Sequence, residues 1–316
     1  MSLNPRSRLC FVADGRLPAK EEANHRSATA ERWRLLLLRS RLLLCAASPG
    51  RVPGAAMAVR PASAHGSAWR RVRRSRFPGD AASGLSLSAM FQTPQPIVIL
   101  GGFLINPEAY GPMRCRLERL SGQPVSLVAV GKPLWSLTVF AFAWALILDR
   151  VATTVAELAR RSPTGRVTLV GHSSGGVMLR LFLDAAPFQG RRYNGQALAD
   201  TLVMLGSPHT ALKATRLRQM VQRRLPGAAF ADQVRYVSVA GDLDLGEASP
   251  LARRMAPTAY RNSTGLADDR GDGLVPVASA LLDGSTPVVL EGVAHGGAFG
   301  PSWYGTPEVE IGRAHV

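Results

Sequence analysis

The sequence predicts an α/β domain built on a doubly wound, mostly parallel sheet. Short, continuous apolar runs of four to eight residues recur from Pro96 onward, as expected for strands that are buried on both faces. Segments with helical spacing of apolar residues separate these runs, and glycines or polar turns end them. Strands that alternate with helices favour parallel pairing, with helices on both faces of the sheet.

The expected elements follow one another along the chain without an internal repeat. The strand-like runs are 97–100, 125–130, 167–170, 202–205, 234–241 and 287–290. The helical segments are expected at 108–120, 143–161 and 175–186. Within the second of these, Ile147, Val151, Val155 and Leu158 recur every three or four positions, which is the spacing of one helix face.

Positive charge is concentrated at the N-terminus. Residues 1–90 hold 16 of the 38 Lys and Arg residues but only 5 of the 22 Asp and Glu residues. The rest of the chain has a net charge of only +5, against +16 for the whole. Because a nucleic-acid-binding domain needs basic residues clustered on its folded part, this distribution argues against a nucleic-acid partner.

Residues 1–90 are expected to form a disordered basic leader. No acidic residue lies between Glu31 and Asp80, where Arg, Ala and Ser abound. This composition is typical of an organellar transit peptide, and we expect the plastid (chloroplast) as its destination, with the mitochondrion or the cytoplasm as alternatives. Met1, Met57 and Met90 are the alternative start positions. Two arginines interrupt the leucine-rich run 35–44, so we expect neither a membrane anchor nor a secretory signal there.

The expected domain occupies residues 91–309. Residues 310–316 match what a sequencing adapter encodes in this frame, so we expect them to be foreign to the native chain. The three cysteines, Cys10, Cys45 and Cys115, lie far apart in the sequence. We therefore expect no disulfide framework and no metal site built on cysteines. We also expect no other metal site and no cofactor.

Ser173 is the candidate nucleophile. It lies in Gly171-His172-Ser173-Ser174-Gly175, a G-x-S-x-G pattern between a strand-like run and a helix-like run. A serine on a strained turn between strand and helix exposes its Oγ at the carboxyl edge of the sheet. Glycines are needed on both sides because helix and strand approach closely there. Ser174 fits the pattern less well, since His172 rather than glycine stands two positions before it.

A serine nucleophile needs a base and an acid that orients the base. Of the six histidines, His209 and His295 lie in the domain outside the serine turn, and only His295 directly follows the last expected strand. Two aspartates compete for the role of acid. Asp242 follows the strand 234–241, and Asp272 lies in a Gly-Asp-Gly turn shortly before His295.

Five segments of the chain resemble the lipase-like branch of the α/β-hydrolase superfamily. The resemblance covers about residues 95–305 and rests on the segments 99–103, 171–176, 205–209, 271–276 and 292–295. It implies the α/β-hydrolase fold with Ser173, His295 and Asp272 as a catalytic triad. Asp242 is the alternative acid, with capping or orientation of its own loop as its other role.

The resemblance also implies an oxyanion hole made of two backbone N–H groups. One belongs to Ser174 and the other to Phe103, with Leu104 as the alternative to Phe103. Many relatives have His-Gly or Pro-Gly before this position, whereas this chain has Gly101-Gly102. The departure is mild, because the donor is a backbone group. A plain glycine turn that ends the strand is the structural alternative.

Residues 133–148 are the most hydrophobic stretch of the chain. One interpretation is an acyl-binding or interfacial loop that leads into a helix, with Trp135 and Leu104 in contact with the substrate. The other is a buried helix packed on the sheet. The segment 210–230, which holds four arginines, is either a lid or surface helix that favours anionic lipid or a solvated face.

Together these features predict a serine ester hydrolase that cleaves a lipid or another acyl ester through an acyl-enzyme. Acyl transfer and thioester cleavage by the same triad are alternatives, because only the acceptor or the leaving group changes. A non-catalytic binding module of the same fold is the alternative from another class. The expected partners are the acyl substrate and a membrane surface, without a transmembrane span.

Overall fold

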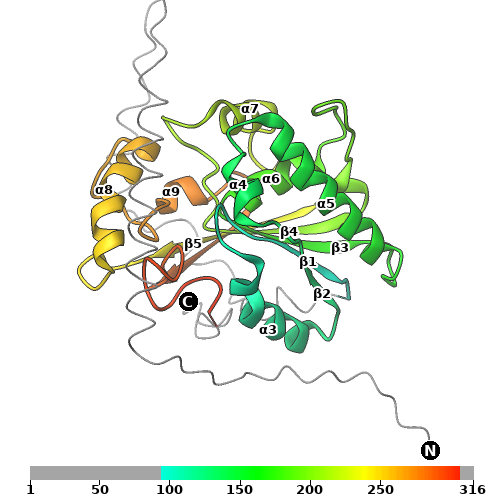
Figure 1. Cartoon of the computed structure of the whole chain (residues 1–316), viewed down its shortest axis with the longest axis horizontal. Helices are drawn as coiled ribbons and strands as arrows, with labels where there is room; N and C mark the ends of the chain where they lie inside the picture. The colour runs from blue at the N-terminus through cyan, green and yellow to red at the C-terminus, as the bar shows by residue number, and fades with distance from the viewer. Residues whose placement is uncertain (1–93, 307–316) are drawn as a thin grey trace, which may run out of the picture. The chain divides into compact units, whose positions relative to one another are not determined.

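The computed structural model describes residues 94–306 of the chain. Within this range, six strands form one parallel sheet in the order β2-β1-β3-β4-β5-β6, as Figure 1 shows. The strands are β1 (Ile97–Leu100), β2 (Val125–Leu127), β3 (Val167–His172), β4 (Ala199–Leu205), β5 (Arg235–Asp242) and β6 (Thr286–Glu291). The predicted α/β fold with a doubly wound, parallel sheet is confirmed by this strand order and by helices on both faces of the sheet.

The helices that were expected from periodicity are present with small shifts. They are α3 (Gly111–Ser121), preceded by the 3-10 turn η2 (Pro107–Tyr110), α5 (Ala141–Ala159) and α6 (Ser174–Leu183). The other elements are α4 (Lys132–Ser136), the 3-10 turn η3 (Gly195–Ala197), α7 (Arg216–Arg224), α8 (Pro250–Thr264) and α9 (Val277–Ala280).

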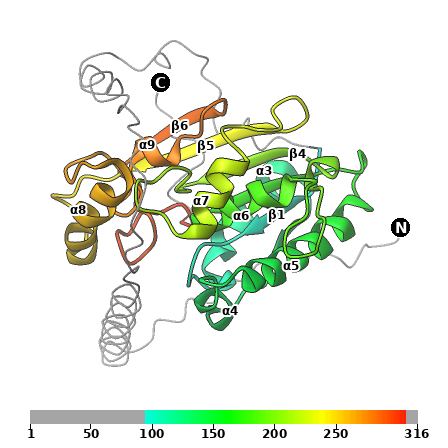
Figure 2. The same ribbon diagram turned by 90° about the horizontal axis from the view of Figure 1, so that it is seen from above.

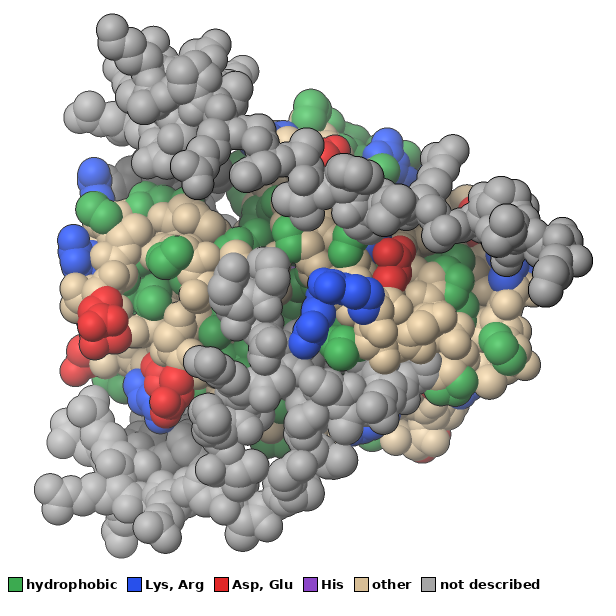
Figure 3. Space-filling model, turned by 90° about the horizontal axis from the view of Figure 1, so that it is seen from below, with side chains coloured by type: hydrophobic (Ala, Val, Ile, Leu, Met, Phe, Trp, Pro, Cys, Tyr) green, Lys and Arg blue, Asp and Glu red, His purple; other side chains and the backbone are tan. Residues whose placement is uncertain are grey.

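Alternation along β1 explains why helices cover both faces of the sheet. All four of its residues are buried, but successive side chains of a strand point to opposite faces. Ile97 and Ile99 pack in one core with residues of α3, and Val98 and Leu100 pack in a second core with α5 and α6. Figures 1 and 2 show α3 on one side of the sheet and α5, α6 and α7 on the other. On the α3 side, which Figure 3 shows, exposed hydrophobic side chains are dispersed among charged and other groups.

The strand order creates a switch point between β1 and β3. From β1 the chain moves outward to β2 at one edge, then returns to β3 on the other side of β1 and continues to β6. Loops that leave β1 and β3 therefore diverge at the carboxyl edge of the sheet. Open α/β sheets bind their ligands outside the carboxyl ends of strands at such a point.

The apolar stretch 133–148 does not form one continuous helix. Helix α4 ends at Ser136, and Phe140 has extended backbone angles (φ −103°, ψ 140°) immediately before α5. Residues of α5 such as Trp144, Ile147 and Leu148 are buried, as the buried-helix interpretation expects. Phe140 and Phe142 are about half exposed, so the start of α5 keeps an apolar surface.

Several expectations fall outside the described residues. These are the basic leader at 1–90, its alternative start positions and targeting role, and the foreign tail at 310–316. Among residues 94–306, no helix has the length and apolar character required to cross a membrane.

Candidate active site

Ser173 occupies a strained turn between β3 and α6. Its backbone angles (φ 53°, ψ −124°) lie in a region that non-glycine residues rarely adopt, and its N–H donates to the Leu205 carbonyl at 2.8 Å. The hydrogen bond ties the turn to the end of the neighbouring strand β4. Strand, turn and helix therefore hold the serine at the carboxyl edge of the sheet, the arrangement that presents a nucleophilic hydroxyl.

The glycines around Ser173 are required by close backbone packing. A Cβ on Gly171 would lie 2.5 Å from the Gly176 Cα, on the facing first turn of α6. A Cβ on Gly175 would collide with the carbonyl oxygens of Leu100 and Gly101, at the end of β1. These contacts involve backbone atoms, which cannot move aside as a flexible side chain can. The G-x-S-x-G pattern is thus explained by the packing of α6 against β1 and β3.

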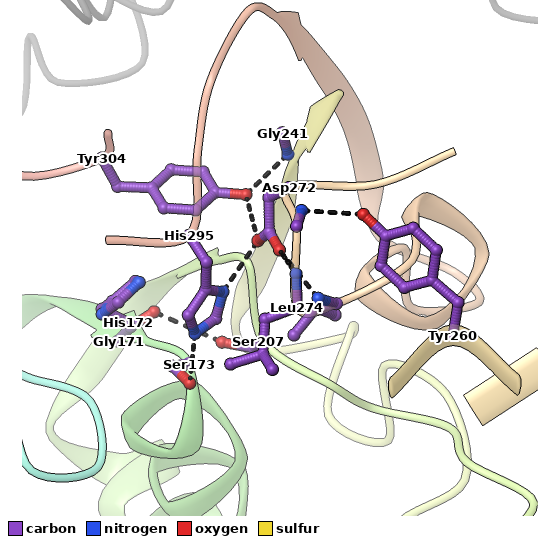
Figure 4. A network of polar contacts seen from close by, with 12 residues as sticks. Gly171, His172, Ser173, Ser207, Gly241, Tyr260, Asp272, Leu274, His295 and Tyr304 are labelled. Atoms are coloured by element: carbon purple, nitrogen blue, oxygen red, sulfur yellow. Dashed lines mark hydrogen bonds and ion pairs between the residues drawn. The ribbon is translucent and has the colours of Figure 1, made fainter. Parts of the chain in front are cut away.

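His295 joins Ser173 to Asp272. Its Nε2 lies 2.9 Å from the Ser173 Oγ, and its Nδ1 lies 2.8 Å from the Asp272 Oδ2 (Figure 4). The backbone N–H of His295 also donates to the Asp272 carbonyl at 2.8 Å, which fixes the two loops to each other. All three residues are buried, with 8% or less of each exposed. The structure therefore brings together the serine, base and acid that were expected from the sequence.

The carboxylate of Asp272 accepts four hydrogen bonds. The Leu274 and Val275 N–H groups donate to Oδ1 at 3.0 and 2.7 Å, while His295 and the Tyr304 hydroxyl (3.1 Å) donate to Oδ2. The first two donors come from the turn that follows the aspartate itself, in the Gly-Asp-Gly-Leu-Val-Pro segment. These bonds replace the water that a buried charged carboxylate has lost.

Tyr304 is a site residue that the sequence analysis missed. Its hydroxyl accepts a hydrogen bond from the Gly241 N–H at 2.6 Å, so its own proton is directed to Asp272. Burial, together with the nearby Asp272 charge, raises the pKa of Tyr304 well above its ordinary value, which keeps this proton in place. No local pattern marks the residue, because its partner lies 32 positions earlier in the chain.

The alternative acid, Asp242, does not contact His295. Its carboxylate forms an ion pair with Arg270, whose Nε donates to Oδ2 at 2.7 Å. Asp242 is the last residue of β5, and of the two aspartates only Asp272 has its side chain within hydrogen-bond distance of the histidine. Asp242 instead fixes the segment 269–271 that leads into the Asp272 turn.

The turn after β1 lies directly beside Ser173. A Cβ on Gly102 would be 3.0 Å from the Ser173 Cβ, so only a glycine fits there. The Gly102 N–H is occupied, because it donates to the Tyr110 hydroxyl at 2.8 Å. The N–H of Phe103 makes no hydrogen bond within residues 94–306, and Ser174, as the first residue of α6, has an N–H without an intrahelical acceptor. These two groups are the expected oxyanion donors.

Leu104, the alternative donor, has a left-handed backbone conformation with φ 59°. Such a conformation is strained for a leucine, and strain of this kind concentrates at functional sites. Its side chain is partly buried against the core that contains α5 and α6. The structure therefore places Leu104 beside the turn but turned toward the protein core.

Trp135 is a core residue. Only 1% of it is exposed, and its ring packs edge-on against Phe103 with 6.4 Å between ring centroids. Phe103 itself is 44% exposed. Substrate contact by Trp135 stays a prediction, and in this structure its direct neighbour near the site is Phe103.

Other exposed apolar side chains lie at the start of α5 and on the loop before it. We call the following set the apolar rim: Phe103, Leu137, Val139, Phe140, Phe142 and Leu146, each more than two-fifths exposed. Phe140 and Phe142 stack with 5.7 Å between ring centroids. Residues 137–140 follow β2 and α4, on the loop that leads into α5.

The arginine-rich segment 210–230 forms α7 and its flanking loops. Two of its arginines are turned inward: Arg218 donates to the Pro208 carbonyl at 3.1 Å, and Arg224 pairs with Asp184 at 2.5 Å. Arg216 and Arg223 remain available to solvent to a greater extent. Helix α7 is therefore neither solvated on all its arginines nor cationic over its whole surface.

Two further histidines are buried and electrically neutral. His209 lies with its Nδ1 3.3 Å from an Arg180 guanidinium nitrogen, and burial together with the charges of Arg180 and Arg218 lowers the pKa of His209 well below its ordinary value. His172 stands beside His295, with 4.9 Å between ring centroids. Neither side chain reaches the Ser173 hydroxyl, so His295 is the base that the geometry offers.

Comparisons with known proteins find partial structural likenesses. No family model and no curated protein matches the chain. Similar solved structures include polyneuridine aldehyde esterase (15% identity, TM-score 0.29, 42% of this chain and 48% of that one). A second is tomato methylketone synthase I complexed with 2-tridecanone (17% identity, TM-score 0.29, 42% of this chain and 48% of that one). A third is a lipase-esterase related protein from Clostridium acetobutylicum (16% identity, TM-score 0.27, 46% of this chain and 51% of that one). The chain spans about half the length of each of these three proteins.

Proposed function

We propose that the chain is a serine ester hydrolase of the α/β-hydrolase superfamily. The observation that carries the proposal is the position of His295, whose two ring nitrogens lie within hydrogen-bond distance of Ser173 and Asp272. A histidine held in this way can take the serine proton on one nitrogen while the carboxylate stabilises the imidazolium through the other.

The reaction proceeds through an acyl-enzyme. The Ser173 Oγ attacks the acyl carbonyl carbon as its proton passes to the His295 Nε2. The carbonyl oxygen becomes an oxyanion that accepts hydrogen bonds from the Phe103 and Ser174 N–H groups. The tetrahedral intermediate then expels the alcohol, which leaves with the proton from His295. A water molecule attacks the acyl-enzyme in the same manner, releases the carboxylic acid and restores the serine.

The substrate class that we favour is a lipid or another long-chain acyl ester. The support comes from the apolar rim, because a cluster of exposed aromatic and aliphatic side chains favours contact with an apolar ligand. Its exposed aromatic residues also suit contact with a membrane surface, where amphipathic and apolar groups lie at the headgroup level. We also propose that the N-terminal leader directs the chain to the plastid.

A fluorophosphonate probe tests the nucleophile, because it labels only an activated serine. Labelling should occur on the wild-type chain, be abolished by Ser173→Ala and persist in Ser136→Ala, which removes an exposed hydroxyl on α4. Turnover of p-nitrophenyl esters, thioesters and polar lipids, each with and without an added alcohol acceptor, separates hydrolysis from acyl transfer. Labelling that persists in Ser173→Ala, or a wild-type chain that is neither labelled nor active, contradicts the proposal.

A further inference from the structure

The hydroxyl of Tyr110 joins the two segments that flank the candidate oxyanion hole. It accepts a hydrogen bond from the Gly102 N–H at 2.8 Å and lies 2.7 Å from the His172 Nδ1. Gly102 immediately precedes Phe103 in the turn after β1, and His172 immediately precedes Ser173 at the end of β3. Both Tyr110 and His172 are fully buried.

The protonation of this pair follows from counting donors. The Tyr110 oxygen accepts from Gly102, and among residues 94–306 the His172 Nδ1 is the only acceptor within hydrogen-bond distance of its hydroxyl proton, so Nδ1 acts as the acceptor. Burial and the neighbouring His295 lower the pKa of His172 well below its usual value, although a contact with the His295 backbone acts in the opposite direction. Burial raises the pKa of Tyr110. A neutral histidine and a protonated tyrosine are thus the forms that the bond requires.

The turn that contains Gly101 and Gly102 packs so closely against Tyr110 that the turn and the tyrosine ring must move together. A Cβ on Gly101 would lie 2.6 Å from the Tyr110 ring, and a Cβ on Gly102 would lie 2.8 Å from the His172 Nδ1. Glycine backbone is therefore in direct contact with both side chains. A shift of either ring would change the position of Phe103, the next residue along the chain.

We propose, on the basis of the ester-hydrolase function above, that Tyr110 is a positioning residue for the oxyanion hole. Through Gly102 on one side and His172 on the other, its hydroxyl sets the Phe103 N–H at a fixed distance from the Ser174 N–H. Neither Tyr110 nor His172 touches the reacting atoms. Their role is to hold two N–H donors, one in the turn after β1 and one at the start of α6, at the spacing that one oxyanion requires.

Transition-state stabilisation should therefore depend on the Tyr110 hydroxyl, and ground-state binding should not. Removing a whole oxyanion donor lowers kcat by roughly 100- to 1,000-fold in a serine hydrolase. A donor that is displaced but still present loses only part of its stabilisation of the oxyanion. We therefore expect Tyr110→Phe to lower kcat by roughly 10- to 100-fold. KM should change by less than about threefold, because the acyl group is bound before the oxyanion exists.

The test compares an oxoester with the corresponding thionoester, whose carbonyl oxygen is replaced by sulfur. Backbone N–H donors stabilise a developing O⁻ better than the larger, weaker acceptor S⁻, so the oxo-to-thiono ratio of kcat/KM reports on the hole. Tyr110→Phe should lower this ratio about as much as it lowers kcat. The matched control is Tyr193→Phe, which removes a tyrosine hydroxyl that donates to Ala145 and Asp149 away from the site. Thermal unfolding of both variants measures any common loss of stability.

Two substitutions of His172 provide a rescue experiment. In His172→Asn, the Oδ1 takes the place of Nδ1 and accepts the Tyr110 proton, whereas His172→Leu offers no acceptor. The asparagine variant should keep a higher oxo-to-thiono ratio than the leucine variant. Equal ratios in both, or a Tyr110→Phe ratio equal to that of Tyr193→Phe, would show that Tyr110 only fills space. A wild-type chain that turns over neither ester would instead overturn the hydrolase function itself.

Discussion

Tyr304 and His295 donate to the same carboxylate oxygen of Asp272, at 3.1 and 2.8 Å. The tyrosine comes from the end of the described chain, whereas the histidine comes from the loop after β6. The shared oxygen places Asp272 between the two, and the Tyr304 hydroxyl is in turn held by the Gly241 N–H. The orientation of the Asp272 carboxylate therefore depends on β5, on its own turn and on the segment that holds Tyr304.

Tyr304→Phe should lower kcat/KM by about tenfold. A hydrogen bond to a charged group contributes roughly 1.5–3 kcal/mol, and the lost bond leaves the Asp272 side chain with one fewer restraint. The two N–H donors to Oδ1 remain, so the effect should be smaller than loss of the acid itself. Steady-state kinetics on a soluble p-nitrophenyl ester measure the change. Full activity in Tyr304→Phe would show that the turn alone orients the carboxylate.

Asp272→Asn should lower kcat by roughly 1,000- to 10,000-fold, because an amide favours the wrong histidine tautomer. Asp242→Asn is the matched control, since it alters a neighbouring carboxylate that pairs with Arg270. Its kcat should stay within about threefold of the wild type, because Asp242 makes no contact with His295. Comparable losses in the two variants would contradict the assignment of Asp272 as the acid.

Much of this architecture could be predicted from the sequence because it is locally encoded. Buried parallel strands read as continuous apolar runs, and all six predicted strands correspond to β1–β6. Gly171, Gly175 and Ser173 form a pattern that strand–helix packing demands, so the nucleophile turn is visible within eleven residues. His295 could be selected because, of the histidines in the domain outside the serine turn, only this one directly follows the last expected strand.

What the sequence could not provide depends on contacts between distant segments. Asp242 is the last residue of β5 and Asp272 lies in a later turn, and the structure separates them because Asp242 pairs with Arg270 whereas Asp272 contacts His295. Tyr110 and Tyr304 act through single hydroxyl groups whose partners lie far along the chain. No helix was expected from the sequence at α8, whose interior holds Pro257, although Ser249 caps its start and Gly265 ends it.

The stability of the fold should fall as the pH drops below about 6.5. The pKa values of His172 and His209 are lowered in the folded protein, mainly by burial, so the unfolded chain binds protons that the folded one does not. The free energy of unfolding then decreases by up to about 1.4 kcal/mol per pH unit for each histidine, until the folded pKa is reached. At pH values well above 6.5 both histidines are neutral in the folded and the unfolded chain, and their contribution to this slope vanishes.

Urea unfolding between pH 6 and pH 5, above the range in which carboxylates titrate, measures this slope. His209→Asn removes one of the two groups and keeps an acceptor near Arg180, so the slope should decrease by up to about 1.4 kcal/mol per pH unit. An unchanged slope in His209→Asn would mean that this histidine is protonated in the folded protein.

Acyl-chain preference should depend on the exposed part of the apolar rim. Each buried methylene contributes roughly 0.8 kcal/mol, so kcat/KM should rise about fourfold per CH₂ from acetyl toward octanoyl esters if the rim contacts the chain. The double variant Phe140→Ser/Phe142→Ser should flatten this rise with little change in unfolding free energy, because both rings are about half exposed. Trp135→Ala, by contrast, should cost roughly 3–5 kcal/mol of stability, because it empties a buried site. Val289→Ser, on the edge strand β6, is the control for loss of an exposed apolar side chain. A wild-type profile that peaks at acetyl, or a rise that survives in the double variant, would make the rim a surface without a role in acyl recognition.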